Sequence, residues 1–244
     1  PKEGLLFDKK HILLDPYAKA VTGQSVWGKA LNTGGYRARV VRNNFFWGSE
    51  KPDKIPMEKL IIYEMHVRGF TKMDKSVRHP GTFAGIKEKI PYLKTLGINA
   101  VELMPIFEFD ELQGSREVDG KKLIDYWGYN TVSFFAPNTS YAASTEYNRE
   151  GVELKELIRE SADRVHILVG SGVTPEVINC LTDEIGARYF HMSGKKIIDS
   201  GMKYRKEQVN MGMPGMSEYE IYRTDEEQVR RARTIMNQKC GEIR

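Results

Sequence analysis

The feature that most constrains this chain is a strand pattern, a helix pattern and a second strand pattern that follow one another between residues 60 and 106. Residues 60–67 are rich in β-branched and aromatic side chains over a short span, which is typical of a buried strand. Residues 83–96 carry apolar side chains three and four positions apart, between a Thr82 cap and a Gly97 stop. A second strand is predicted over 100–106. This succession predicts a βαβ unit with parallel strands and a right-handed crossover.

The rest of the chain repeats this alternation after a long interruption. Pro91 removes one helical hydrogen bond, so we expect a kink in the first helix. Residues 107–147 are predicted to form a long loop rich in aromatic residues, and a helix is expected over 153–158. A strand over 164–173 then ends in a glycine loop.

Strong helix signals mark the end of the chain. Thr174 and Pro175 begin a helix that Gly186 ends. A strand is predicted over 188–194, and the last helix is expected to begin at a capping box made by Thr224 and Glu227.

Composition favours a globular protein and excludes several classes of partner. With 244 residues, 40% of them hydrophobic, the chain could fill one (β/α)8 barrel or two small domains. Its net charge of +4 is spread along the chain, so no nucleic-acid partner is expected. Because no apolar run approaches the roughly 18 residues of a membrane span and residues 1–4 lack a signal-peptide core, we expect no membrane association and a cytoplasmic location. Cys180 and Cys240 are expected to be reduced thiols.

Four landmarks in order give the first 160 residues a specific resemblance. They are LLDPYAKA at 13–20, YEMHVRGFT at 63–71, the segment 97–105, and DYWGYN at 125–130. In this order they resemble the isoamylase and glycogen-debranching branch of the α-amylase superfamily. That resemblance implies later strands carrying an Asp-x-x-x-Asn-His motif, an Asp nucleophile, a Glu acid/base and a His-Asp pair, and none of these follows the helix at 153–158.

The end of the chain resembles a different family. Residues 162–244 are similar to the last third of the CutC family, which is named for copper homeostasis and folds as a (β/α)8 barrel. The segments that carry this similarity are GSGV at 170–173, FHMS at 190–193, SGMKYR at 200–205 and SEYE at 217–220.

No catalytic residue is predicted, because glycoside hydrolysis needs two placed carboxylates. The carboxylates expected to be exposed in the first piece are Glu64, Glu102, Glu108, Asp110 and Asp125, and the resemblance gives none of them a catalytic role. It does imply that Tyr129 stacks on a sugar ring, so Tyr129 and nearby Trp127 are the candidate α-glucan contacts. The alternative, that the aromatic residues of this loop only pack it onto the barrel, is favoured.

Two further sites are considered in the second piece. The backbone N–H groups of Gly170, Ser171 and Gly172 could cradle a phosphate-like anion, with Ser193 and Gly194 beside them, or these glycines could simply make a tight turn. Copper is suggested only by the CutC resemblance. Its candidate ligands are His191, Met211, Met213 and Met216, although a methionine loop and a strand histidine are more often packing residues.

Together these patterns predict an α/β fold, an incomplete (β/α) barrel with a half-barrel-like parallel sheet. An irregular lead-in (1–57) precedes a barrel fragment of α-amylase type (58–160) and a barrel fragment of CutC type (161–244). Exposed strand edges favour a homodimer. The expected function is a composite without glycosidase activity. The alternatives are a CutC-like anion- or copper-binding module, and a fragment of an α-1,6-glucan debranching hydrolase that needs a complementing chain.

Overall fold

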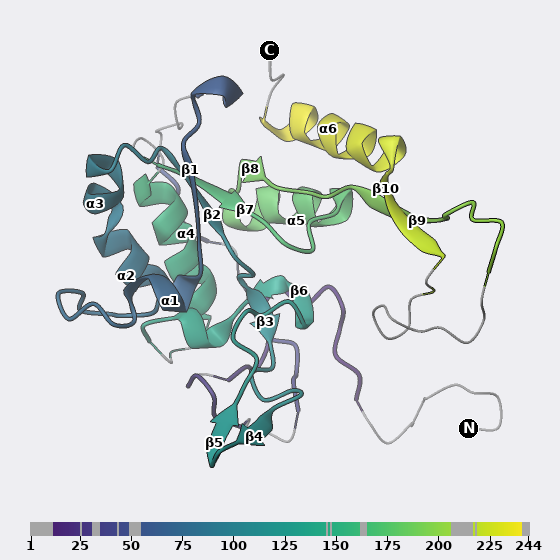
Figure 1. Ribbon diagram of the computed structural model, residues 1–244. Helices are drawn as coiled ribbons and strands as arrows, with labels where there is room; N and C mark the ends of the chain where they lie inside the picture. Colours follow the sequence, from purple (N-terminus) through teal and green to yellow (C-terminus); the bar gives the residue numbers. More distant parts are fainter. Residues whose placement is uncertain are drawn as a thin grey trace.

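A parallel sheet lies at the centre of the protein. The computed structural model describes residues 12–24, 26–30, 35–42, 44–48, 55–144, 146, 148–161, 165–205, 217 and 219–240. Four parallel strands lie in chain order: β1 (Ile62–Met65), β2 (Ala100–Leu103), β7 (His166–Val169) and β8 (Tyr189–Phe190) (Figure 1). The predicted α/β fold with a parallel sheet is therefore confirmed.

Helices connect the strands of this sheet. Between β1 and β2 lie α1 (Val67–Thr71), α2 (Phe83–Glu88) and α3 (Ile90–Thr95). The predicted kink at Pro91 is a break between α2 and α3 at Lys89. The predicted cap at Thr82 is confirmed, because its hydroxyl accepts a hydrogen bond from the Gly85 N–H at 3.1 Å. The helix α4 (Arg149–Ser161) precedes β7 and packs against α2 and α5.

The helix α5 (Pro175–Ile185) follows the sequence signals closely. Thr174 Oγ1 accepts from the Val177 N–H at 3.3 Å, and Gly186 ends the helix in the left-handed conformation at φ 65°. The last helix, α6 (Glu226–Cys240), differs from the prediction because Thr224 belongs to β10. The Asp225 carboxylate, not Thr224, accepts from the Glu227 N–H.

The predicted long loop 107–147 is wrong, since the segment contains β-structure. The strand β3 (Phe107–Phe109) pairs antiparallel with β6 (Thr131–Pro137), and β4 (Arg116–Val118) pairs with β5 (Lys121–Leu123). Short 3-10 helices occupy Thr139–Tyr141 (η2) and, before β1, Met57–Lys59 (η1).

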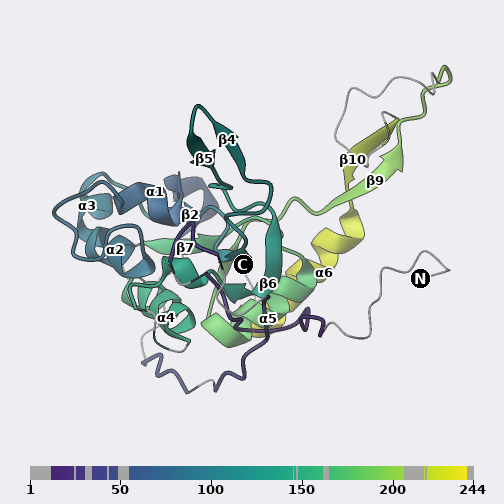
Figure 2. The same ribbon diagram turned by 90° about the horizontal axis from the view of Figure 1, so that it is seen from below.

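A two-stranded arm was also not predicted. The strands β9 (Lys195–Asp199) and β10 (Glu220–Thr224) pair antiparallel and project from the body of the molecule, as Figures 1 and 2 both show. The expected strand 188–194 is reduced to β8, because the chain leaves the sheet to enter this arm.

One hydrophobic core joins residues from both predicted fragments. It includes Val101 and Leu103 of β2, Leu154 of α4, Val169 of β7 and Ala232 of α6. Part of the lead-in packs on this body, since Val21 is buried against Ala136 of β6. Among the described residues, no helix is long and apolar enough to cross a membrane.

Candidate functional site

A buried histidine anchors the segment that carries the candidate glucan contacts. His66 follows β1, and its Nδ1 accepts a hydrogen bond from the Gly69 N–H at 3.0 Å. Nε2 must then carry the proton, and it lies 2.7 Å from the Tyr126 carbonyl oxygen and 3.1 Å from the Tyr141 hydroxyl. Burial lowers the pKa of His66, which favours this neutral form. The histidine therefore ties residues 125–130 to the carboxyl end of β1.

Aromatic packing fixes the same segment from the other side. The rings of His66 and Tyr126 stack with centroids 4.3 Å apart, and Trp27 packs edge-on against Tyr126 at 5.8 Å. Gly128 has φ 78°, and a Cβ there would lie 2.6 Å from the Phe109 ring. Only glycine fits this turn without strain.

The two candidate glucan contacts are more exposed than Tyr126, although Trp127 still packs edge-on against Tyr126 with ring centroids 5.6 Å apart. Trp127 is 52% exposed and Tyr129 is 62% exposed, whereas Tyr126 forms the ring stack on His66. Packing accounts for Tyr126 and for one edge of Trp127, but it leaves about half of the Trp127 side chain and more than half of Tyr129 open to solvent. The geometry thus provides two solvent-facing aromatic side chains on an anchored turn.

Two glutamates lie on the sheet near Tyr129. Glu64 of β1 and Glu102 of β2 are register partners on adjacent parallel strands, so they share a face of the sheet. Burial, followed by the charges of Glu64 and Glu102, raises the pKa of Tyr129. His191, after β8, pairs through Nδ1 with a Glu102 carboxylate oxygen. Strands that are distant in sequence therefore bring Tyr129, Glu102 and His191 into one region.

The predicted anion loop has the expected turn but an unfavourable neighbour. Ser171 and Gly172 both adopt left-handed φ angles, 63° and 65°. A Cβ on Gly170 would lie 2.8 Å from a carboxylate oxygen of Glu102, so a negative charge stands beside the loop. The carbonyl of Gly194, next to Ser193, accepts from the Asp225 N–H at 2.7 Å, which ties that segment to the start of α6. The anion site stays a prediction.

The metal site also stays a prediction. Within the described residues, no group of three or more His, Cys, Asp or Glu side chains is arranged to hold a metal ion. Met211, Met213 and Met216 lie outside the described residues.

A pair of buried acids, Glu108 and Glu111, differs from the prediction from the sequence, in which Glu108 is exposed. Glu108 is fully buried in β3, and its carboxylate accepts from the Thr139 N–H at 2.7 Å. Burial raises the pKa of Glu108 to about 8 and that of Glu111 to about 7. The position of Glu108 between Phe107 and Phe109 was the available signal, although alternation alone does not show which face of a strand is covered.

Comparisons with known proteins come mainly from glucan-active enzymes. No protein-family model matches the chain. It is 40% identical to isoamylase 1 of Arabidopsis thaliana over 176 residues, which cover 67% of this chain and 22% of that protein. It is 35% identical to isoamylase 3 of Oryza sativa over 213 residues, covering 83% and 26% of the two chains. A GlgX homologue of Mycobacterium tuberculosis is 35% identical over 182 residues, covering 65% and 25%. The chain thus spans about a quarter of the length of these relatives.

Solved structures agree with these sequence relatives. A pullulanase of Anoxybacillus sp. LM18-11, solved with maltotetraose, has a TM-score of 0.50 and 29% identity, covering 65% of this chain and 23% of that one. Pullulanase SAP of Group B Streptococcus, also solved with maltotetraose, matches 93% of this chain and 34% of its own with a TM-score of 0.63, and at 19% identity it shows a shared fold alone. None of these relatives bears on the CutC resemblance. Over about two thirds of its length, the chain is similar to the isoamylase and glycogen-debranching branch of the α-amylase superfamily.

Proposed function

We propose that this chain is part of an α-glucan debranching hydrolase, contributing four strands of its (β/α) barrel and an α-glucan contact at Trp127 and Tyr129. The similarity to isoamylases supports this proposal over the composite and CutC-like alternatives, and the structural likeness to one pullulanase extends beyond residue 161. Four parallel strands in chain order are also what half of a (β/α)8 barrel requires. Hydrolysis then needs the strands that carry the two catalytic carboxylates, which the sequence does not contain.

The observation that carries the proposal is the exposure of Trp127 and Tyr129 on a turn that His66 fixes. Aromatic faces bind the apolar face of a pyranose ring, and a rigid turn presents them without an ordering cost. In a barrel, the carboxyl ends of the strands form the substrate side, and His66 lies at the carboxyl end of β1.

Titration with maltotetraose tests the contact. We expect the variants Trp127→Ala and Tyr129→Ala each to weaken binding by about 5- to 10-fold, since an aromatic contact contributes about 1 kcal/mol. Tyr92→Ala on α3, where the tyrosine is also exposed, is the matched control and should bind as the wild type does. Equal affinity in all four proteins would rule out this contact.

Complementation tests the hydrolytic part of the proposal. A branched glucan should be cleaved only after the chain is mixed with a fragment that supplies the remaining barrel strands and both carboxylates. Cleavage by the chain alone would show that the assignment of catalysis to missing strands is wrong.

A further inference from the structure

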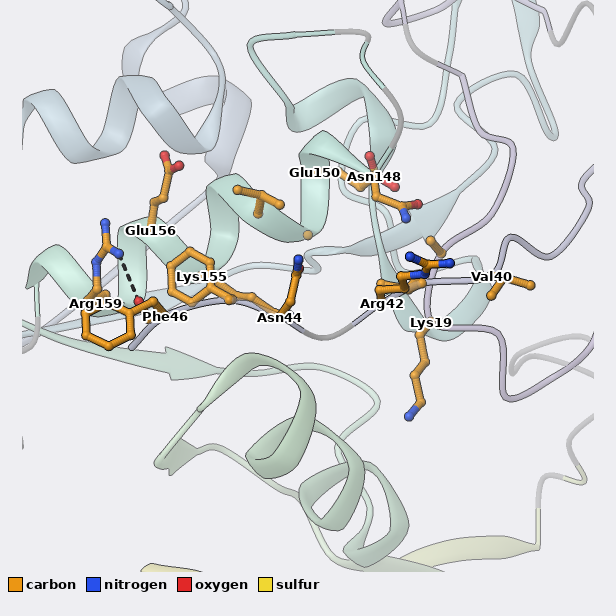
Figure 3. Close-up of a pocket in the computed structure, with 15 residues that line it drawn as sticks. Lys19, Val40, Arg42, Asn44, Phe46, Asn148, Glu150, Lys155, Glu156 and Arg159 are labelled. Carbon is orange, nitrogen blue, oxygen red and sulfur yellow. Dashed lines mark hydrogen bonds between the residues drawn. The ribbon is translucent and has the colours of Figure 1, made fainter. Parts of the chain in front are cut away.

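A cavity of about 800 Å³ lies between the lead-in, at residues 40–42 and 44–46, and α4 (Figure 3). Two of its basic side chains already have partners within the protein. The Arg159 guanidinium donates to the Phe46 carbonyl oxygen at 3.0 Å, and Lys19 pairs with a glutamate of α5. The lining of this cavity therefore favours no particular ligand, whereas the arm formed by β9 and β10 carries a more specific surface.

The arm exposes apolar side chains on both of its faces. Ile197 of β9 is 54% exposed, and its register partner Tyr222 of β10 is 44% exposed. Ile221 is 45% exposed, and it belongs to the opposite face because side chains alternate along a strand. A sheet of only two strands is marginally stable in water, whereas a sheet with more strands and an apolar face is stable. The arm therefore gains stability when further strands are added to it.

One edge of β9 is open to such pairing. Within the part of the chain that the structure describes, β9 pairs only with β10, and the arm stands away from the body in Figures 1 and 2. The Gly194 carbonyl and the Ser200 N–H, just outside the two ends of β9, each make a backbone hydrogen bond of 2.7 Å to a residue that flanks β10. Backbone groups that face the partner strand alternate along an antiparallel pair. The backbone groups of Lys195, Ile197 and Asp199 are therefore directed at the free edge.

The sequence of β9 is complementary to itself in the antiparallel direction. The strand reads KKIID from Lys195 to Asp199. When two copies of β9 lie antiparallel about a two-fold axis at Ile197, this isoleucine faces its own counterpart and Lys195 faces Asp199 of the second copy. These are the residues whose backbone groups point to the free edge, so each such pair can exchange two N–H···O bonds. A two-fold axis requires this kind of self-complementary surface.

The charges of the arm favour the same arrangement. The register of the arm places Glu220 directly opposite Asp199, and like charges in that position are unfavourable. Arg205 of the same chain also pairs with Asp199. Lys195 of a second copy adds a further positive charge beside these two carboxylates. Lysine on an edge strand usually opposes pairing with another strand, but here it meets an opposite charge.

The free edge of β10 lacks this complementarity. By the same alternation, the backbone groups of Glu220, Tyr222 and Thr224 point away from β9. Two copies of β10 paired about Tyr222 would place Glu220 opposite Thr224, which makes no ion pair, and Ile221 opposite Arg223. The edge of β9 is therefore the better surface for pairing.

We propose that two copies of this chain associate through β9 and form a four-stranded antiparallel sheet of strand order β10-β9-β9-β10. Ile197 and Tyr222 of both copies then make one apolar row across the sheet, because the two residues are partners within each arm. The homodimer expected from exposed strand edges is thus assigned to the arm and not to the parallel sheet. A contact through strands of five residues is smaller than a typical stable interface, so the dimer forms only at high protein concentration.

Sedimentation velocity of the full chain tests the contact. We expect the sedimentation coefficient to rise from that of a monomer to that of a dimer between about 5 and 500 μM. Ile197→Pro removes an N–H at the centre of the free edge and spares the bonds to β10, since proline is tolerated where the N–H of an edge strand faces outward. It should weaken association by about tenfold or more. Tyr222→Pro makes the matched change at the free edge of β10 and should associate as the wild type does.

Exchange of charges tests the register. Lys195→Glu brings two carboxylates together at both ends of the pairing, and Asp199→Lys brings two cations together. Each variant alone should associate about fivefold or more weakly. An equimolar mixture of the two variants restores a pair of opposite charges at each end, so mixed dimers should form with nearly the affinity of the wild type.

Three results would overturn the inference. The first is a monomer at every concentration. The second is a dimer that persists in Ile197→Pro, which would place the contact elsewhere, as at the free edge of β1. The third is a mixture of the two charge variants that associates as weakly as either variant alone. All of these measurements are made without glucan, so none of them bears on the proposed contact at Trp127 and Tyr129.

Discussion

Replacing Glu108 with glutamine tests whether a buried acid makes the stability of this protein depend on pH. The side chain is fully buried, and burial raises its pKa from 4.5 to about 8. The folded state therefore binds the proton more tightly than the unfolded state does. The stabilisation is fully present below pH 4.5 and is lost as the pH rises toward 8.

The size of the effect follows from the pKa difference. One pKa unit corresponds to about 1.4 kcal/mol, so Glu108 reduces the free energy of unfolding by at most about 5 kcal/mol between pH 4.5 and pH 8. Glu111, with a pKa of about 7, contributes in the same direction. Glu108→Gln removes only the first contribution, and its amide oxygen can still accept from the Thr139 N–H.

Urea unfolding at pH 5, 6, 7 and 8, followed by tryptophan fluorescence, measures this difference. We expect the variant to lose much less stability than the wild type between pH 5 and pH 8, by about 2–4 kcal/mol. The quantity compared is the change in the free energy of unfolding with pH. Burying the introduced amide also changes the free energy of unfolding, but by the same amount at every pH. Glu117→Gln on exposed β4 is the control and should follow the wild type. Parallel curves for wild type and Glu108→Gln would show that Glu108 does not titrate between these pH values.

Two other substitutions test local features of the fold. Gly128→Ala should lower the free energy of unfolding by about 1–3 kcal/mol, because it places a Cβ against Phe109 at a left-handed φ. An unchanged melting temperature in circular dichroism melts would contradict this expectation. The control Gly114→Ala, at a glycine that is also left-handed but has no atom near its added Cβ, measures the cost of the backbone conformation alone. Thr174→Ala should cost about 1 kcal/mol through loss of the α5 cap, and Thr174→Ser should restore most of it. Equal destabilisation by alanine and serine would assign the effect to packing.

Local signals predicted the parts of the fold that local interactions determine. The strands at 62–65 and 166–169 come from short β-branched runs, and the caps at Thr82 and Thr174 act within four residues. The antiparallel pair β3 and β6 was missed because its partners are more than 20 residues apart and its register is irregular. Pairing of β10 with β9 takes Thr224 into a strand, which overrides a capping box that the sequence alone supports.

The candidate site was predicted only in part, for the same reason. The exposure of Trp127 and Tyr129 depends on His66, some 60 residues earlier in the chain. The buried Glu108 carboxylate depends for its hydrogen bond on Thr139, some 30 residues later. Each of these features arises from packing between distant segments, which a single sequence does not specify.

The hydrophobic core joins the segments on the two sides of residue 161. The strand β2, which precedes residue 161, pairs along its whole length with β7, which follows it. Buried side chains on both sides of residue 161, such as Leu157 and Leu181, belong to the same hydrophobic cluster. Cutting the chain there would expose an edge of β2 and apolar surface on α4. The turn with Trp127 and Tyr129 is anchored to β1, and β1 pairs with β2, whose other edge is covered by β7. The proposed glucan contact therefore depends on the segment after residue 161 for its support.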